Sequence, residues 1–122
     1  MILAVAIAML QPKVDQDRLL DCIAVVEGTK PSAPGGEYGL SRLVWQQYSH
    51  LPYRFSAHPA EARLVAKKHL RWLMRSLREE GHPVTVYHLA VCWRHGVERG
   101  IFLFNDPTPG YGRRVEALYG DH

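Results

Sequence analysis

The chain has 122 residues, of which 47% are hydrophobic and 22% charged, and its formal net charge is +3. This length suits one compact domain with a single core, and the composition excludes a disordered, collagen-like or coiled-coil chain. The small positive charge is compatible with a polyanionic partner such as cell wall, nucleic acid or a membrane surface, without selecting among them. Of two interpretations of Cys22 and Cys92, buried free thiols are favoured over a disulfide bridge.

The N-terminal segment, residues 1–10, is apolar throughout. It is too short to span a bilayer, so no transmembrane span is expected. Small residues at Ala4, Ala6 and Ala8 are typical of the apolar centre of a secretory signal, but the basic start of such a signal is missing. The segment is therefore either a remnant of a longer signal, which is slightly favoured, or a buried first element. We treat residues 1–12 as this segment and residues 13–122 as the folded domain.

The first helix is expected over residues 15–27, with Asp15 as its N-cap. Apolar residues cover nearly its whole circumference, which is typical of a central, buried helix. Glu27 is the last helical residue before Gly28, so its side chain is expected at the edge of the core. A turn-rich loop with two prolines and three glycines follows over residues 30–39.

The longest helix is expected over residues 59–80, with an apolar stripe opposite a basic face. The stripe comprises Ala62, Val65, Ala66, His69, Leu73 and Leu77. The basic face comprises Arg63, Lys67, Arg71, Arg75 and Arg78. The other expected elements, in chain order, are a short helix over 40–48, a loop over 51–58, a helix over 84–95, a strand or helical turn at 101–104, and a last helix over 111–119. Five helices without strand partners predict an all-α bundle.

Glu27 is the residue whose position suggests chemistry. A carboxyl group at the end of an apolar helix, beside a glycine-rich loop, is partly desolvated, and desolvation raises its pKa. A carboxylic acid that is still protonated near neutral pH donates a proton to a leaving oxygen, as glycosidic cleavage requires. On these residues alone, a solvated helix-end carboxylate is the commoner situation. Glu37 and Asp106 are weaker candidates for a second carboxylate, because one lies in a flexible loop and the other precedes a proline.

Four segments of the chain carry a family resemblance in their order and spacing. They are the helix end Val25-Val-Glu27, then Tyr38-Gly-Leu-Ser-Arg42, then Ala90-Val-Cys-Trp-Arg-His-Gly96, and finally the helix that starts at Tyr111. Together, over residues 19–119, they resemble the bacterial lytic transglycosylases of the lysozyme-like superfamily. The second segment is similar to that family's Gly-Leu-Met-Gln, the third to its Ala-Tyr-Asn-Ala-Gly, and the fourth to its closing Tyr-Val-x-x-Val helix.

This resemblance implies a small, all-α lysozyme-like domain with a glycan-binding cleft. Glu27 would protonate the glycosidic oxygen between N-acetylmuramic acid and N-acetylglucosamine and then act as base, assisted by the substrate's own N-acetyl group. Tyr111 would orient Glu27. The residues implied to line the cleft are Tyr38, Arg42, Trp93 and Arg94. The implied partner is the glycan strand of peptidoglycan, without a cofactor, in the periplasm or outside a bacterial cell.

Two arginines depart from the family pattern, because Arg42 stands where the family has Gln and Arg94 where it has Asn. Arginine only donates hydrogen bonds, whereas Asn and Gln also accept them. These arginines could pair with carboxylates of the substrate, or with Glu27 and hold it ionised. An enzyme is favoured, with transglycosylation slightly ahead of hydrolysis because no convincing second carboxylate is present. The alternative is a catalytically weak or inactive relative that binds glycan or a protein partner.

Neither metal binding nor nucleic-acid binding is expected. His88 and His95 lie two helical turns apart, and the ligand spacing of a metal site is missing. His69 is expected to be a hydrogen-bonded core residue. The basic face of residues 63–78 includes Trp72, which could stack on a base, but glutamates share the helix, so a solvated charged face is favoured. Core positions are also favoured over sugar platforms for the three tryptophans, Trp45, Trp72 and Trp93.

Overall fold

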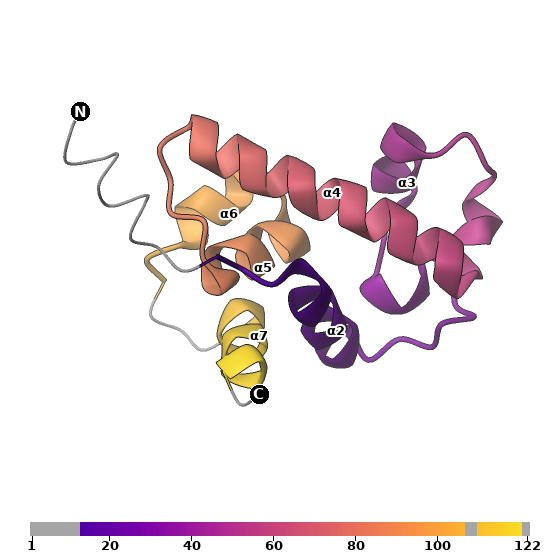
Figure 1. The fold of residues 1–122 in the computed structure, drawn as a ribbon, viewed down its shortest axis with the longest axis horizontal. Helices are drawn as coiled ribbons and strands as arrows, with labels where there is room; N and C mark the ends of the chain where they lie inside the picture. The colour runs from indigo at the N-terminus through magenta and orange to yellow at the C-terminus, as the bar shows by residue number, and fades with distance from the viewer. Residues whose placement is uncertain (1–12, 107–109, 121–122) are drawn as a thin grey trace.

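The computed structural model describes residues 13–106 and 110–120, so the predicted signal remnant at residues 1–12 lies outside the described residues. The described part contains six α-helices, two short 3-10 helices and no strand, which confirms the all-α class with one helix more than expected (Figure 1). The elements are α2 (Gln16–Glu27), η1 (Gly36–Tyr38), α3 (Arg42–Tyr48), η2 (Tyr53–Ala57), α4 (Pro59–Glu79), α5 (Val86–His95), α6 (Val97–Leu103) and α7 (Tyr111–Gly120).

Helix α2 begins and ends where its sequence predicts. The Asp15 side chain accepts a hydrogen bond from the Arg18 backbone N–H at 3.1 Å, and Glu27 is the last helical residue. One expectation is wrong, because Val25 is 67% exposed and the helix is not buried all round. Helix α2 packs against α4, α7 and η1, and its remaining face is open to solvent. Its buried residues are Leu19, Leu20, Cys22 and Ile23.

Helix α4 runs along the length of the domain, and α3 lies near the N-terminal end of α4 (Figure 1). The whole predicted apolar stripe is buried, together with Leu70. Helix α4 contacts α2, α3, α5 and α6, so this stripe organises one core shared by most of the chain. None of the helices in the described ranges is both long and apolar enough to cross a membrane.

Two regions that the pattern left without regular structure are helical. Residues expected to form a loop at 51–58 include η2, and the undecided residues 101–103 belong to α6. Helix α6 packs closely on α5, because a Cβ built on Gly100 would lie 2.9 Å from Cys92 Sγ. Cys22 and Cys92 are both buried and free, so the prediction of unbridged thiols is confirmed.

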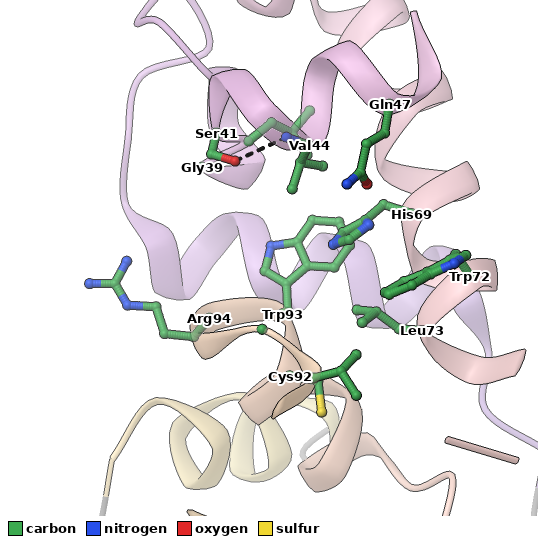
Figure 2. A pocket seen from close by; sticks show the side chains of 13 residues that line it. Gly39, Ser41, Val44, Gln47, His69, Trp72, Leu73, Cys92, Trp93 and Arg94 are labelled. Carbon is green, nitrogen blue, oxygen red and sulfur yellow. Dashed lines mark hydrogen bonds between the residues drawn. The ribbon is translucent and has the colours of Figure 1, made fainter. Parts of the chain in front are cut away.

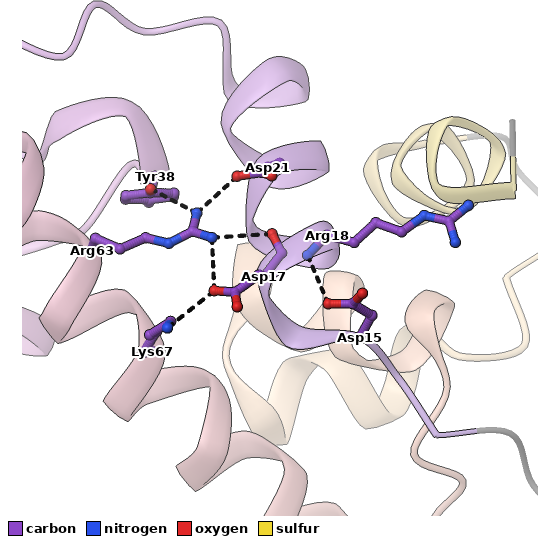
Figure 3. Close-up of polar contacts among 7 residues, drawn as sticks. All are labelled: Asp15, Asp17, Arg18, Asp21, Tyr38, Arg63 and Lys67. Atoms are coloured by element: carbon purple, nitrogen blue, oxygen red, sulfur yellow. Dashed lines mark hydrogen bonds and ion pairs between the residues drawn. The ribbon is translucent and has the colours of Figure 1, made fainter. Parts of the chain in front are cut away.

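The basic face of α4 is only partly a solvated surface, because two of its residues join α4 to α2 (Figure 3). Arg63 donates to Asp17 and Asp21, each at 2.9 Å, and to the Tyr38 hydroxyl at 3.0 Å. Lys67 Nζ lies 3.1 Å from the same Asp17 carboxylate. The hydrogen bonds from Lys67 and Arg63 lower the pKa of Asp17. We call this group, Arg63 with Asp17, Asp21 and Tyr38, the α2–α4 clasp.

Replacing Arg63 by methionine should lower the free energy of unfolding by about 1–2 kcal/mol, because the largely buried Tyr38 hydroxyl loses the hydrogen bond that Arg63 donates. Lys67→Met is the matched control, since it removes an ion pair to the same Asp17 without touching Tyr38. Surface ion pairs contribute little, so the control should cost much less. Urea unfolding of both variants measures the difference, and equal losses would show that the Tyr38 contact is unimportant.

Candidate active site

The Glu27 carboxyl group is held at the edge of the core. Its side chain is only 10% exposed, although it is the last residue of α2. This burial raises the pKa of Glu27, and the positive charges of Arg94 and Arg114 oppose the rise without cancelling it. The negative end of the α2 dipole also disfavours a carboxylate at this position. Glu27 is therefore more easily protonated than a solvated glutamate, as the sequence predicts.

The backbone of Gly39 packs directly against this carboxyl group. A Cβ built on Gly39 would lie 2.3 Å from Glu27 Oε1, and Gly39 has a φ of +65°, a left-handed conformation that disfavours other residues. Any side chain here would displace the carboxyl group. Gly39 belongs to the second of the four family-like segments, so the structure brings that segment against Glu27.

Hydrogen bonds to neighbouring segments anchor the loop that carries Gly39. The Gly35 backbone N–H donates to the buried Ser56 hydroxyl at 2.7 Å, and the Thr29 hydroxyl donates to the Gly36 carbonyl at 2.9 Å. These contacts tie the loop both to η2 and to the residues that follow α2. The position of Gly39 against Glu27 is thus defined from both sides.

Tyr111 and Arg94 complete the surroundings of Glu27. Tyr111 is 9% exposed, and its hydroxyl has no hydrogen-bond partner among the described residues. Burial raises the pKa of Tyr111, and the nearby Glu27 charge raises it further. Arg94 Nη1 lies 3.8 Å from Glu27 Oε2, beyond hydrogen-bond distance, and the Arg94 side chain is 57% exposed. The third and fourth family-like segments therefore also meet at Glu27.

The remaining predicted cleft residues have different positions. Trp93 donates its indole N–H to the Tyr38 carbonyl at 3.0 Å and lines a pocket. Tyr38 was expected to line the cleft, but it is only 2% exposed. It belongs to the core and contacts Trp93 from there. The Arg42 guanidinium lies 4.7 Å from the centroid of the Tyr53 ring, and of the two unusual arginines only Arg94 forms an ion pair with Glu27 among the described residues.

A pocket of about 330 Å³ lies between α3 and α5, with α4 at its side (Figure 2). It shares Gly39 and Arg94 with the surroundings of Glu27, so the two sites are adjacent. The residues that line it are Gly39, Leu40, Ser41, Val44, Gln47, His69, Trp72, Leu73, Cys92, Trp93, Arg94, Gly96 and Val97.

Sequence reasoning anticipated His69 correctly but missed its neighbours in the pocket. His69 is 8% exposed, and its Nδ1 lies 3.0 Å from the Tyr48 hydroxyl, as expected for a hydrogen-bonded core residue. Trp45 is fully buried, whereas Trp72 is 42% exposed and lines the pocket. Arg114 near Glu27 was also missed, although its spacing of three residues from Tyr111 places both on one face of α7.

The histidines and acidic residues of the described ranges do not converge. No group of three or more His, Cys, Asp or Glu residues in these ranges is placed to hold a metal ion. The His88 Nδ1 lies 2.6 Å from the Thr85 hydroxyl at the start of α5. This histidine therefore takes part in a local contact at a helix terminus.

Comparison of the chain with protein-family models, curated proteins and solved structures found no match. The lysozyme-like family therefore stays a prediction that rests on the four segments and on their convergence at Glu27.

Gly39→Ala should displace the Glu27 carboxyl group and lower the free energy of unfolding by about 1–2 kcal/mol or more, from backbone strain plus the clash. Gly81→Ala is the matched control, since Gly81 has a similar φ of +74° but nothing within 4 Å of a built Cβ. Thermal unfolding of both variants separates strain from contact. If both lose the same stability, the tight packing of Gly39 on Glu27 is contradicted.

Glu27→Gln should stabilise the protein at pH 7 but not at pH 4. Because the pKa of Glu27 is raised above its ordinary 4.5, the folded state binds the proton more tightly than the unfolded state. The stability that Glu27 contributes is complete below about pH 4.5 and is lost as the pH rises through the raised pKa. Urea unfolding of both proteins at the two pH values measures this, and a pH-independent difference would contradict it.

Proposed function

We propose that this domain cleaves the glycosidic bond between N-acetylmuramic acid and N-acetylglucosamine in peptidoglycan, with Glu27 as general acid and then base. The observation that carries the proposal is a carboxyl group that is 10% exposed, has a raised pKa and lies beside a pocket. Such a group keeps its proton to a higher pH than an ordinary glutamate, which suits it to donating that proton to a leaving oxygen. The proposal places the domain in the bacterial cell envelope, in the periplasm or outside the cell, where this substrate lies.

The surroundings of Glu27 favour a mechanism with one carboxylate. In the first step, protonated Glu27 gives its proton to the glycosidic oxygen as the bond between that oxygen and the sugar carbon breaks, and the carbonyl oxygen of the substrate's own N-acetyl group bonds to that carbon. In the second step, ionised Glu27 takes a proton from the attacking hydroxyl, whose oxygen bonds to the sugar carbon and displaces the N-acetyl oxygen. Within the described ranges, the charges that shift the pKa of Glu27 belong to arginines and not to a second carboxylate. The N-acetyl group of the substrate would then assist, and an internal sugar hydroxyl is slightly favoured over water as the attacking group.

Tyr111 supports the same proposal as a positioning residue. A buried hydroxyl without a hydrogen-bond partner destabilises a folded protein, and such groups are rare outside functional sites. The Tyr111 hydroxyl is in this situation among the described residues, and Glu27 lies near enough to act on its pKa. A bound sugar hydroxyl, or the protonated form of Glu27, would supply the missing partner.

A second candidate, a catalytically weak domain that binds glycan or a protein partner, is favoured by one observation. Arg94 lies 3.8 Å from Glu27 and stabilises its ionised form. The burial of Glu27 is nevertheless the larger effect, and Arg94 is half exposed, where water screens its charge. The balance of these two effects favours the enzyme.

Nucleic-acid binding is less well supported. Arg63 and Lys67 of the basic face are paired with acidic residues of α2, which reduces the positive charge available to phosphates. The aromatic residue of that face, Trp72, stacks on His69 in the pocket. The features that raised this possibility therefore have structural partners.

The decisive experiment follows the release of soluble muropeptides from purified peptidoglycan. Glu27→Gln should reduce the rate by about 100-fold or more, because general acid catalysis typically contributes at least this factor. Glu37→Gln is the control, since it makes the same change in another glutamate, which lies on η1. Equal rates of muropeptide release by the wild type and the Glu27→Gln protein would contradict the proposal. Binding to peptidoglycan without release by either protein would favour the second candidate.

A further inference from the structure

We infer that the outer face of α4 binds an anionic lipid surface, through a row of four cations and two exposed apolar side chains beside it. The cations, which we call the α4 basic row, are Lys68, Arg71, Arg75 and Arg78. The apolar side chains are Leu64 and Trp72. In this contact the domain lies on the membrane and does not span it. The inference involves neither Glu27 nor a glycan, so it is tested separately from the proposed function.

Helical spacing places the α4 basic row in one line. Successive members are three or four residues apart, which is the separation that brings side chains to the same side of a helix. Leu64 precedes Lys68 by four residues and continues the line. All five side chains are exposed. At about 1.5 Å per residue, the line from Leu64 to Arg78 extends over roughly 20 Å.

The neighbours of α4 leave this line facing solvent. Arg63 and Lys67 lie on one side of it, where they contact α2 (Figure 3). Trp72 lies on the other side, where it lines the pocket (Figure 2). The buried stripe of α4 faces the core, so by helical periodicity the row lies opposite to it. A flat partner can therefore contact the whole row without displacing α2 or the α2–α4 clasp.

The positive charge of the row is not neutralised by acidic residues of the described ranges. None of its four members forms an ion pair with a residue of these ranges, in contrast to Arg63 and Lys67. Helix α4 also has no Asp or Glu between Glu61 and Glu79. Four aligned cations without counter-charges are complementary to a surface that carries many negative charges.

The apolar side chains beside the row favour a lipid surface over other polyanions. Leu64 is 55% exposed and Trp72 is 42% exposed. A membrane interface takes up such side chains, and tryptophan is enriched there. Lysine and arginine bury their aliphatic stems in apolar surroundings while their charges reach the headgroups. The phosphate backbone of a nucleic acid offers no apolar partner to Leu64.

Co-sedimentation of the full chain with vesicles tests the inference. The protein should bind vesicles of equal parts phosphatidylcholine and phosphatidylglycerol more tightly than vesicles of phosphatidylcholine alone, and added salt should weaken this binding. Arg71→Gln combined with Arg75→Gln should lower the partition coefficient roughly 25-fold, because each cation near an anionic membrane contributes a factor of about five.

Lys30→Gln combined with Arg99→Gln is the matched control. It also removes two exposed positive charges, but these lie outside α4. Both proteins keep residues 1–12, so the apolar N-terminal segment contributes equally to each measurement. Circular dichroism and thermal unfolding verify that the variants are folded, as expected for substitutions of exposed residues.

A third variant distinguishes a lipid surface from a nucleic acid. Leu64→Ser should weaken binding to the anionic vesicles about threefold or more, because an apolar side chain is no longer transferred out of water. It should leave binding to duplex DNA unchanged, since all the charges remain. If the protein binds duplex DNA through the row and does not bind vesicles, the row is a nucleic-acid surface and the inference fails.

Two further results would overturn the inference. One is equal binding to the two kinds of vesicle, and the other is an equal loss of binding in the α4 double variant and in its control. Release of muropeptides from purified, lipid-free peptidoglycan should be unchanged by the Arg71 and Arg75 substitutions. A failure of the proposed function, which is measured in that assay, therefore leaves the lipid contact intact.

Discussion

Burial of the Glu27 carboxyl group is the constraint on which the candidate site depends. Ionised carboxylates are strongly stabilised by water, so placing one where it is 10% exposed favours its protonated form. Two arginines oppose this, but Arg94 lies 3.8 Å away on an exposed side chain, where water and salt weaken its effect. The balance favours a carboxyl group that still holds a proton at a pH where an ordinary glutamate has lost it.

The rest of the domain holds this carboxyl group in place. The α2–α4 clasp connects the helix that carries Glu27 to the central helix, and the same clasp reaches Tyr38. Tyr38 in turn accepts a hydrogen bond from Trp93, which lines the neighbouring pocket. The helix that carries Glu27 and the pocket are therefore connected through Arg63 and the buried Tyr38.

The two candidate functions use the same fold and the same pocket. They differ in whether Glu27 donates and accepts a proton. The pocket is lined by His69, Trp72 and Trp93 and by one charged residue, Arg94, and such a lining is suited to saccharide binding whether or not a bond is broken. Catalysis additionally requires that Glu27 gives and takes a proton while Tyr111 stays close. The Tyr111 hydroxyl has no hydrogen-bond partner among the described residues, and a bound sugar hydroxyl would supply one in either case.

Local features of this protein were determined by the sequence, and contacts between distant segments were decided by tertiary packing. Asp15 caps its helix as predicted, and the α4 stripe is buried, because caps and helical periodicity depend on neighbouring residues. Residues 101–103 could not be assigned, since a short apolar run fits either a strand or a helix. The four family-like segments indicated Glu27 and Tyr111. They did not indicate the exposure of Val25 or the α2–α4 clasp. They also did not indicate the pocket that His69, Trp72 and Trp93 line. Those features join residues far apart in the chain, and which side chains meet depends on how whole helices pack.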